Sequence, residues 1–183
     1  MTIRLASTLQ PDSIVDGEGI RTVVWTQGCP HHCPFCHNPQ THDFNGGYVV
    51  ELDDIFKEMN KLRGQDGITL SGGDPMVRPL QSLEIAKYAH KLGLNVWCYT
   101  GYLYENILKN EKQKALLEEV DVLVDGKFLI DERSLDLYYK GSANQRIIDV
   151  KESLKQNMVV EISRYKGKKI FGQMYKKDKS LFI

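Results

Sequence analysis

The pattern that decides the fold is clearest in residues 67–75, which read GITLSGGDP. After the leading glycine, residues 68–70 form a short run rich in apolar and β-branched side chains, which is typical of a buried strand. Two glycines follow at once, and glycine lets a backbone approach a ligand without a side chain in the way. The stretch therefore predicts a strand that ends in a ligand-binding loop, although glycine pairs also occur in ordinary turns.

Three other segments repeat this strand pattern, namely residues 22–25, 95–100 and 121–124. Apolar residues at one-face helical spacing lie between them and predict helices over residues 52–62, from residue 80 to before Gly93, and over residues 103–120. Strand and helix in alternation indicate a parallel sheet with right-handed crossovers, closed or partly closed into a barrel.

Length and charge narrow the class of protein. The chain has 183 residues, enough for one compact domain, with 24 basic and 24 acidic residues and a net charge of zero. No overall field draws such a chain to nucleic acid or to an anionic membrane. The first residues lack the apolar core of a secretory signal, and charged residues interrupt every long apolar stretch. We therefore expect a cytoplasmic protein that binds neither nucleic acid nor membrane.

The composition changes after residue 150. Residues 151–183 contain eight lysines and one arginine against three acids. Residues 159–163 and 169–172 are suited to two strands about a turn at residues 166–168, so we expect a solvated basic hairpin rather than a partner-docking surface. The predicted organisation is a partial-barrel domain over residues 1–150 and a basic C-terminal extension over residues 151–183 that packs on the same domain.

Three of the four cysteines lie close together in the segment CPHHCPFC, residues 29–36. The fourth, Cys98, lies in an apolar run and is interpreted as a small core residue. The cytosol keeps thiols reduced, which argues against a disulfide framework and favours a metal site. Soft sulfur ligands spaced three and then two residues apart suit an iron–sulfur cluster or zinc.

Spacing alone leaves two kinds of metal site open. A cubane cluster normally has four cysteine ligands, so three would leave one iron open to an exogenous ligand, which implies chemistry. Alternatively, His31, His32 or His37 completes a tetrahedral zinc site and the chain is a zinc-stapled interaction module.

Polar motifs follow the other predicted strands as well. TGY occupies residues 100–102, and DGK occupies residues 125–127. The carboxyl ends of parallel strands meet at one edge of a sheet, so we expect these motifs to join the cysteine loop in one active site. Asp125 and Lys127 would share a face if the strand continued through them, and their alternative interpretation is a surface ion pair.

The cysteine loop resembles the signature of the radical S-adenosylmethionine superfamily, because Phe35 directly precedes the last of three cysteines with this spacing. The stretch DGEGIR at residues 16–21 and the run CHN at residues 36–38 are similar to its branch of glycyl-radical-enzyme activases. Residues 140–150, which read KGSANQRIIDV, favour an activase whose partner is the anaerobic ribonucleoside-triphosphate reductase over one for pyruvate formate-lyase. The resemblance covers roughly residues 11–150.

This resemblance implies an α/β fold of the radical S-adenosylmethionine type, an incomplete (β/α) barrel of about six mainly parallel strands. It also implies one [4Fe–4S] cluster per chain, ligated by Cys29, Cys33 and Cys36, which reductively cleaves S-adenosylmethionine after receiving an electron from flavodoxin or ferredoxin. The resulting 5′-deoxyadenosyl radical would abstract hydrogen from a glycine of the partner enzyme. No catalytic side chain beyond the cluster and its cofactor is expected.

The same resemblance assigns residues to the cofactor. Phe35 would lie against the adenine, while Gly72, Gly73 and Asp74 would hold the methionine amino group. Asp125 and Lys127 would reach the ribose hydroxyls and the cofactor carboxylate. Two further cofactor contacts are assigned to Cys36 and His37.

Four polar residues near these motifs have no single predicted role. Asn144 and Arg146 would bind cofactor or partner, or serve as buried structural groups. His31 and His32, like His37, lie beside the cysteines and could tune a cluster through charge and hydrogen bonding, but we interpret them as ordinary loop residues.

Overall fold

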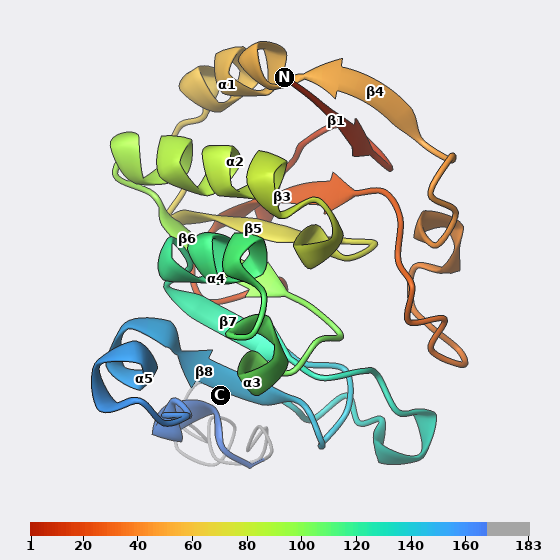
Figure 1. The fold of residues 1–183 in the computed structure, drawn as a ribbon, viewed down its shortest axis with the longest axis vertical. Coiled ribbons are helices and arrows are strands. Elements are labelled where there is room, and N and C mark those ends of the chain that lie inside the picture. Colours follow the sequence, from red (N-terminus) through yellow and green to blue (C-terminus); the bar gives the residue numbers. More distant parts are fainter. Residues whose placement is uncertain (168–183) are drawn as a thin grey trace, which may run out of the picture.

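The computed structural model describes residues 1–167, which form a single eight-stranded sheet with helices packed against it (Figure 1). The strand order is β4-β1-β3-β5-β6-β7-β8, and β2 pairs with β3 off this path. The central strands are parallel to one another and are β3 (Arg21–Thr26), β5 (Gly67–Gly72), β6 (Asn95–Tyr99) and β7 (Val122–Asp125). They correspond to the four strands predicted from the sequence, which confirms a mixed α/β fold around a parallel central sheet.

Four further strands flank this centre in antiparallel pairings. They are β1 (Thr2–Leu5), β2 (Gln10–Ser13), β4 (Tyr48–Glu51) and β8 (Arg146–Asp149). The described sheet therefore has eight strands rather than about six, and its antiparallel strands lie on both sides of the parallel ones. β2 and β4 are mostly exposed, so they lack the buried apolar pattern by which a strand is predicted from sequence.

The helices bury one face of the sheet. They are α1 (Leu52–Lys61), α2 (Pro79–Lys91), α3 (Tyr104–Ile107), α4 (Glu111–Glu118) and α5 (Val150–Gln156), with short 3-10 turns η1 (Pro39–Thr41), η2 (Pro75–Val77), η3 (Ile130–Glu132) and η4 (Ser163–Tyr165). Their apolar side chains and those of the strands share one core, in which Ile68, Leu70, Val96 and Cys98 are fully buried. The predicted core role of Cys98 is confirmed.

The prediction of a single helix over residues 103–120 is wrong. The chain forms α3 and α4 instead, with a break before Asn110. The Asn110 side-chain oxygen accepts hydrogen bonds from the backbone amides of Lys112 and Gln113, at 3.1 and 3.2 Å. This N-cap starts a new helix where apolar periodicity alone suggested continuity.

A second, smaller cluster of buried side chains contains Trp97, Val124, Ile147 and Tyr165. The first three come from β6, β7 and β8, and the Tyr165 ring lies edge-on 5.9 Å from that of Trp97. Tyr165 thus places the segment after α5 against the sheet. The strand expected over residues 159–163 is reduced to an isolated bridge between Ile148 and Glu161, and the strand expected over residues 169–172 lies outside the described residues.

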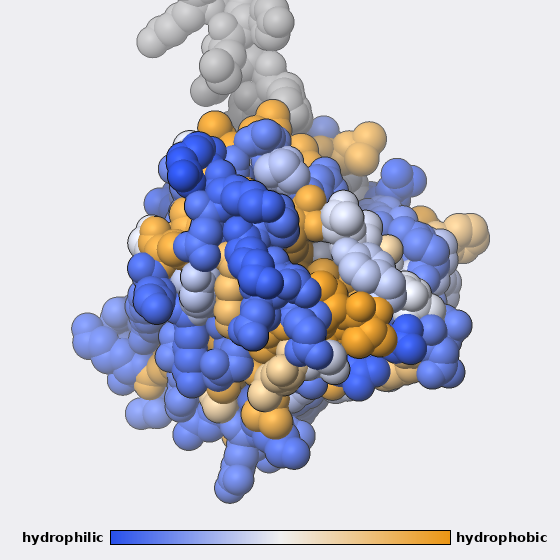
Figure 2. Space-filling model, turned by 90° about the horizontal axis from the view of Figure 1, so that it is seen from above, coloured by the Kyte–Doolittle hydropathy of each residue, from blue (hydrophilic) through white to orange (hydrophobic). Residues whose placement is uncertain are grey.

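The visible surface is largely hydrophilic. Figure 2 shows a face dominated by hydrophilic residues, with hydrophobic residues in separate small groups. Within residues 1–167, no helix combines the length and the hydropathy needed to cross a bilayer.

Candidate cofactor site at the strand ends

Loops that follow the four parallel strands meet around one cavity of about 110 Å³. The lining comes from the cysteine loop after β3, the glycine pair at the end of β5, Thr100 and Gly101 after β6, and residues 126–128 after β7. Parallel β-α connections bring these segments together, because every such strand ends at the same edge of the sheet. The structure thus unites the motifs that the sequence spreads over about a hundred residues.

All three clustered cysteines line this cavity as free thiols. Cys29 is buried, whereas Cys33 and Cys36 are half-buried. Burial raises the pKa of the Cys29 thiol to about 11, so this thiol stays protonated at neutral pH unless a metal replaces the proton. Because Cys98 lies in the core, the described residues offer three cysteine ligands here and no fourth.

The spacing of donor atoms distinguishes a cluster from a single zinc ion. Tetrahedral zinc with bonds of 2.3 Å would bring its sulfur ligands to about 3.8 Å from one another. In residues 1–167, the one trio of metal-type donors within 4.8 Å of one another is Cys29, His31 and Asp74, so the three sulfurs are spread more widely. A wider set of three thiols around one cavity fits a [4Fe–4S] cluster better than a zinc knuckle.

The three histidines considered as zinc ligands each have another neighbour. The His31 ring nitrogen Nε2 lies 2.7 Å from an Asp74 carboxylate oxygen. The His32 ring lies edge-on to that of His42, with centroids 5.2 Å apart, and the His37 ring lies 4.7 Å from that of Phe128. These contacts do not assemble a Cys₃His zinc site.

Asp74 is buried, with 1% of its surface exposed, and its carboxylate is fully engaged by protein groups. One oxygen accepts from the Met76 amide at 2.9 Å, and the other accepts from the Gly101 amide at 3.0 Å and from His31. The Thr100 hydroxyl lies 2.9 Å from both oxygens. Asp74 therefore connects the loops around the cavity.

The glycine pair is required for close backbone packing. Gly72 has a φ of +101°, and a Cβ there would lie 2.6 Å from the Thr26 backbone. A Cβ on Gly73 would lie 2.4 Å from the carbonyl oxygen of Gly28, the residue just before Cys29. Both glycines thus let the β5 loop contact the start of the cysteine loop, and both line the cavity.

Asp125 and Lys127 do not share a face. β7 ends at Asp125, and Gly126, with a φ of +97°, turns the chain, so Asp125 is buried while Lys127 is exposed at the cavity. The Asp125 carboxylate accepts from the Arg146 guanidinium at 2.9 and 2.5 Å and from the Tyr104 amide at 2.8 Å. The same-face expectation failed because the strand ends at Asp125, two residues before Lys127.

Arg146 binds two carboxylates at once. Beyond Asp125, its guanidinium donates to both oxygens of Glu105, each at 2.9 Å. These bonds lower the pKa of Glu105 to about 2 and raise that of Arg146. Asn144 is also engaged by the protein, because its side-chain amide donates to the Lys127 carbonyl at 2.9 Å. In the described structure both side chains are therefore hydrogen-bonded to protein groups.

Phe35 lies apart from the cavity. Its side chain is 77% exposed, and its backbone adopts a φ of +57°, which is uncommon for a residue with a side chain. Phe35 projects from the cysteine loop at a position where an incoming molecule could cover it.

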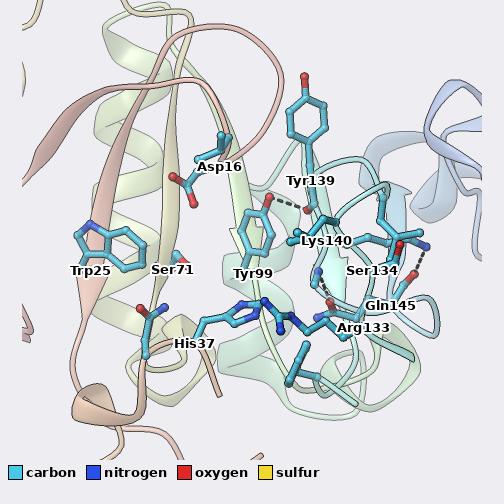
Figure 3. Close-up of a pocket in the computed structure, with 16 residues that line it drawn as sticks. Asp16, Trp25, His37, Ser71, Tyr99, Arg133, Ser134, Tyr139, Lys140 and Gln145 are labelled. Atoms are coloured by element: carbon cyan, nitrogen blue, oxygen red, sulfur yellow. Dashed lines mark hydrogen bonds between the residues drawn. The ribbon is translucent and has the colours of Figure 1, made fainter. Parts of the chain in front are cut away.

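A larger cavity of about 320 Å³ adjoins the cysteine cavity (Figure 3). The two share Ser71, Tyr99, Phe128 and Gln145 in their linings. Figure 3 shows Asp16 and Trp25 on one side and the loop bearing Arg133 and Lys140 on the other.

Sequence reasoning missed most of this second cavity. Asp16 could have been found from the DGEGIR motif, and Tyr99 from its place next to the predicted loop at residues 100–102. Arg133 lies in an irregular stretch with no recognisable signal.

Several known proteins are similar to this chain in sequence. A family model described as a 4Fe-4S single cluster domain matches residues 15–148. The anaerobic ribonucleoside-triphosphate reductase-activating protein of Haemophilus influenzae is 33% identical over 148 residues, covering 75% of this chain and 92% of that protein. The proteins of the same name from Escherichia coli K12 and bacteriophage T4 are 35% and 32% identical, covering 74% and 76% of this chain and 92% and 90% of those proteins.

The fold also resembles a solved structure. The crystal structure of QueE from Escherichia coli aligns with a TM-score of 0.50 at 12% identity, covering 72% of this chain and 74% of that one. At this low identity the likeness concerns the arrangement of the sheet and helices alone.

Proposed function

The chain belongs to the family of anaerobic ribonucleoside-triphosphate reductase-activating proteins, and from that premise we propose that it is a radical S-adenosylmethionine activase. Its partner is the glycyl radical subunit of anaerobic ribonucleoside-triphosphate reductase, and flavodoxin or ferredoxin supplies the electron. When bound, the [4Fe–4S] cluster supplies the chemistry that cleaves S-adenosylmethionine and leads to a glycyl radical on the partner. The protein acts in the cytoplasm.

One observation carries this proposal: three cysteines and no fourth line a cavity at the strand ends. Cys29, Cys33 and Cys36 would hold the cluster and leave one iron open. An open position is what a bound cofactor needs, whereas a purely structural cluster would have a complete ligand set. Cys98 cannot supply the missing ligand, because it lies in the hydrophobic core.

The lining of the two cavities suggests which groups would hold S-adenosylmethionine. Gly72, Gly73, Lys127 and Cys36 line the cysteine cavity. The glycine backbone and the lysine ammonium would hold the cofactor there, and Cys36 would contact it as a ligand of the cluster. His37 borders the larger cavity, where the nucleoside would extend. We propose that the curved sheet acts as an incomplete barrel around this cofactor.

Three of the residues that the resemblance assigns to the cofactor would contact it less directly or not at all. Asp74 and Asp125 have their carboxylates occupied by protein donors and would support the loops around the cofactor. Phe35 would meet the adenine only if the cofactor or a loop movement covered its exposed ring.

The partner would enter through the larger cavity. Its edge carries Val15 from the β2–β3 loop and Leu135 from the β7–β8 loop, which are 69% and 81% exposed. Exposed apolar side chains on both sides of an opening suit a protein substrate that covers them during reaction. The glycine-bearing segment of the reductase is the occupant expected there.

The cofactor assignment is tested with Cys33→Ala and, as a matched control, Cys98→Ala. After anaerobic reconstitution with iron and sulfide, the wild type and Cys98→Ala should be brown and should convert S-adenosylmethionine to methionine and 5′-deoxyadenosine with a reductant. Cys33→Ala should do neither while keeping its far-ultraviolet circular dichroism. Cofactor cleavage retained in Cys33→Ala would exclude the ligand assignment.

A further inference from the structure

One buried carboxylate joins loops that come from three neighbouring strands. Asp74 follows β5, and its oxygens accept from His31 in the loop after β3 and from Thr100 and Gly101 after β6. A buried carboxylate without partners would be costly, so each of these donors stabilises the charge and is held in place by it. The result is a hydrogen-bonded connection that uses protein groups alone.

His31 is held on several sides. Its side chain is 8% exposed, its Nε2 lies 2.7 Å from Asp74, and its ring meets that of Tyr102 edge-on at 4.6 Å. A Cβ on Gly101 would lie 2.4 Å from the His31 ring, so the absence of a side chain at Gly101 makes room for the imidazole. His31 stands between Cys29 and Cys33 in the chain, so its position constrains both.

The backbone supports the same connection. The Asp74 amide donates to the Gly28 carbonyl at 2.9 Å, and the Gly73 amide donates to the Thr26 carbonyl at 2.7 Å. On its other side the cysteine loop is bonded to the segment at η1, where the Cys29 amide donates to the His42 carbonyl at 3.1 Å. The start of the loop is therefore fixed from both sides.

We propose that Asp74 and His31 form a clamp that fixes the cysteine loop before any metal is bound, with His31 as a positioning residue for Cys29 and Cys33. Asp74 then serves as the anchor of this clamp rather than as a free acceptor for a ligand. The clamp itself stands on the geometry of the protein, and its effect on a cluster rests on the proposed function. A preset loop lowers the conformational cost of gathering three thiols around a cluster.

The first test uses the metal-free protein. Hydrogen exchange followed by mass spectrometry should show the amides of residues 28–37 exchanging about tenfold faster in His31→Ala, the size expected for losing one hydrogen bond to a charged group. His31→Gln keeps a donor near the position of Nε2 and should restore slow exchange. His32→Asn changes an exposed histidine in the same loop, suits its left-handed backbone (φ +47°) and should behave like the wild type. Equal exchange in His31→Ala and His32→Asn would overturn the clamp.

The second test measures the cluster. Reconstituted His31→Ala should hold less iron than the wild type and should show a shifted midpoint potential and a changed electron paramagnetic resonance spectrum, all restored in His31→Gln. Failure of His31→Gln to restore any of these would contradict a positioning role.

The clamp and the proposed function can be refuted separately. If His31→Ala did not fold, Asp74→Asn would replace it, because it removes the charge that His31 contacts and lies outside the cysteine loop. Slow exchange of residues 28–37 in that variant would contradict the clamp. A wild-type protein that binds a cluster without cleaving S-adenosylmethionine would refute the proposed function, while the exchange experiment would still decide the clamp.

Discussion

Asp74 and Asp125 lie in two regions of one site and look alike in the sequence. Each stands at or just after the end of a parallel strand, and each is buried, with 1% and 0% of its surface exposed. Their partners differ. Asp74 receives hydrogen bonds from several groups spread over three loops, whereas Asp125 is bound mainly by one guanidinium, that of Arg146.

The difference shows that a buried carboxylate can organise a site in two ways. Around Asp74, many donors share one charge, so the loss of a single donor leaves the others in place. Around Asp125, one guanidinium supplies most of the hydrogen bonds. The loss of Arg146 leaves the buried carboxylate with the Tyr104 amide, and the loss of Asp125 leaves Arg146 with Glu105. We expect mutations on the Asp74 side to alter loop position and those on the Asp125 side to alter stability.

The largest effect is expected for Asp125→Ala. This change leaves Arg146 partly buried with Glu105 as its remaining acid, and the free energy of unfolding should fall by about 3 kcal/mol, as for other broken buried pairs. Urea denaturation of the metal-free protein measures it. Asp136→Ala, at an exposed acid in the same connection between β7 and β8, is the control and should be nearly neutral. Equal stability of the two variants would contradict the ion-pair account.

A smaller loss of stability is expected for Asp74→Asn. The amide keeps the shape but turns one acceptor into a donor facing protein N–H or O–H groups, which should cost about 2 kcal/mol. The variant should also lose iron after reconstitution more readily than Asp125→Asn does. If Asp125→Asn lost iron faster, the division between the two regions would be wrong.

The Asp125 region should also depend on pH. Arg146 holds the pKa of Glu105 at about 2, below the roughly 4.3 of a free glutamate. A lowered pKa in the folded state means that the stabilisation is present above about pH 4.3 and is lost as the pH falls towards 2. The stability difference between wild type and Glu105→Gln should therefore shrink as the pH falls from about 4.3 towards 2. A difference that grew on acidification would have the wrong sign.

The smallest effect on stability is expected for two exposed apolar residues, Phe35 in the cysteine loop and Leu135 in the connection between β7 and β8. Phe35→Ser and Leu135→Ser should each change the free energy of unfolding by less than about 0.5 kcal/mol, because neither side chain is packed. Leu135→Ser should weaken activation of the partner while leaving cofactor cleavage unchanged. If Leu135→Ser lost S-adenosylmethionine cleavage in the absence of the partner, Leu135 could not be a residue that acts only on the partner at the larger cavity.

Much of the fold followed from local pattern. The four parallel strands are short, buried and β-branched, so their sequences carry a clear signal. The exposed strands β2 and β4 carry no such signal, because their pairing depends on neighbours far along the chain. The break at Asn110 depended on a capping side chain that competes with apolar periodicity.

The sequence was enough to predict which loops form the site, but not which hydrogen bonds their side chains make. The spacing of the cysteines and the positions of the strand-end loops were enough to predict one common cavity. Whether Asp74 and Asp125 had free oxygens depended on His31 and Arg146, each distant in sequence from the acid it binds. A sequence shows which groups can bind a cofactor, but not which of them the protein itself has already occupied.

An electron paramagnetic resonance spectrum of the partner enzyme shows whether this protein activates the reductase. The anaerobically reconstituted protein is mixed with reductant, S-adenosylmethionine and either anaerobic ribonucleoside-triphosphate reductase or pyruvate formate-lyase. We predict a glycyl radical doublet with the reductase, which disappears when Cys33→Ala replaces the wild type. A doublet with pyruvate formate-lyase and none with the reductase would contradict the account.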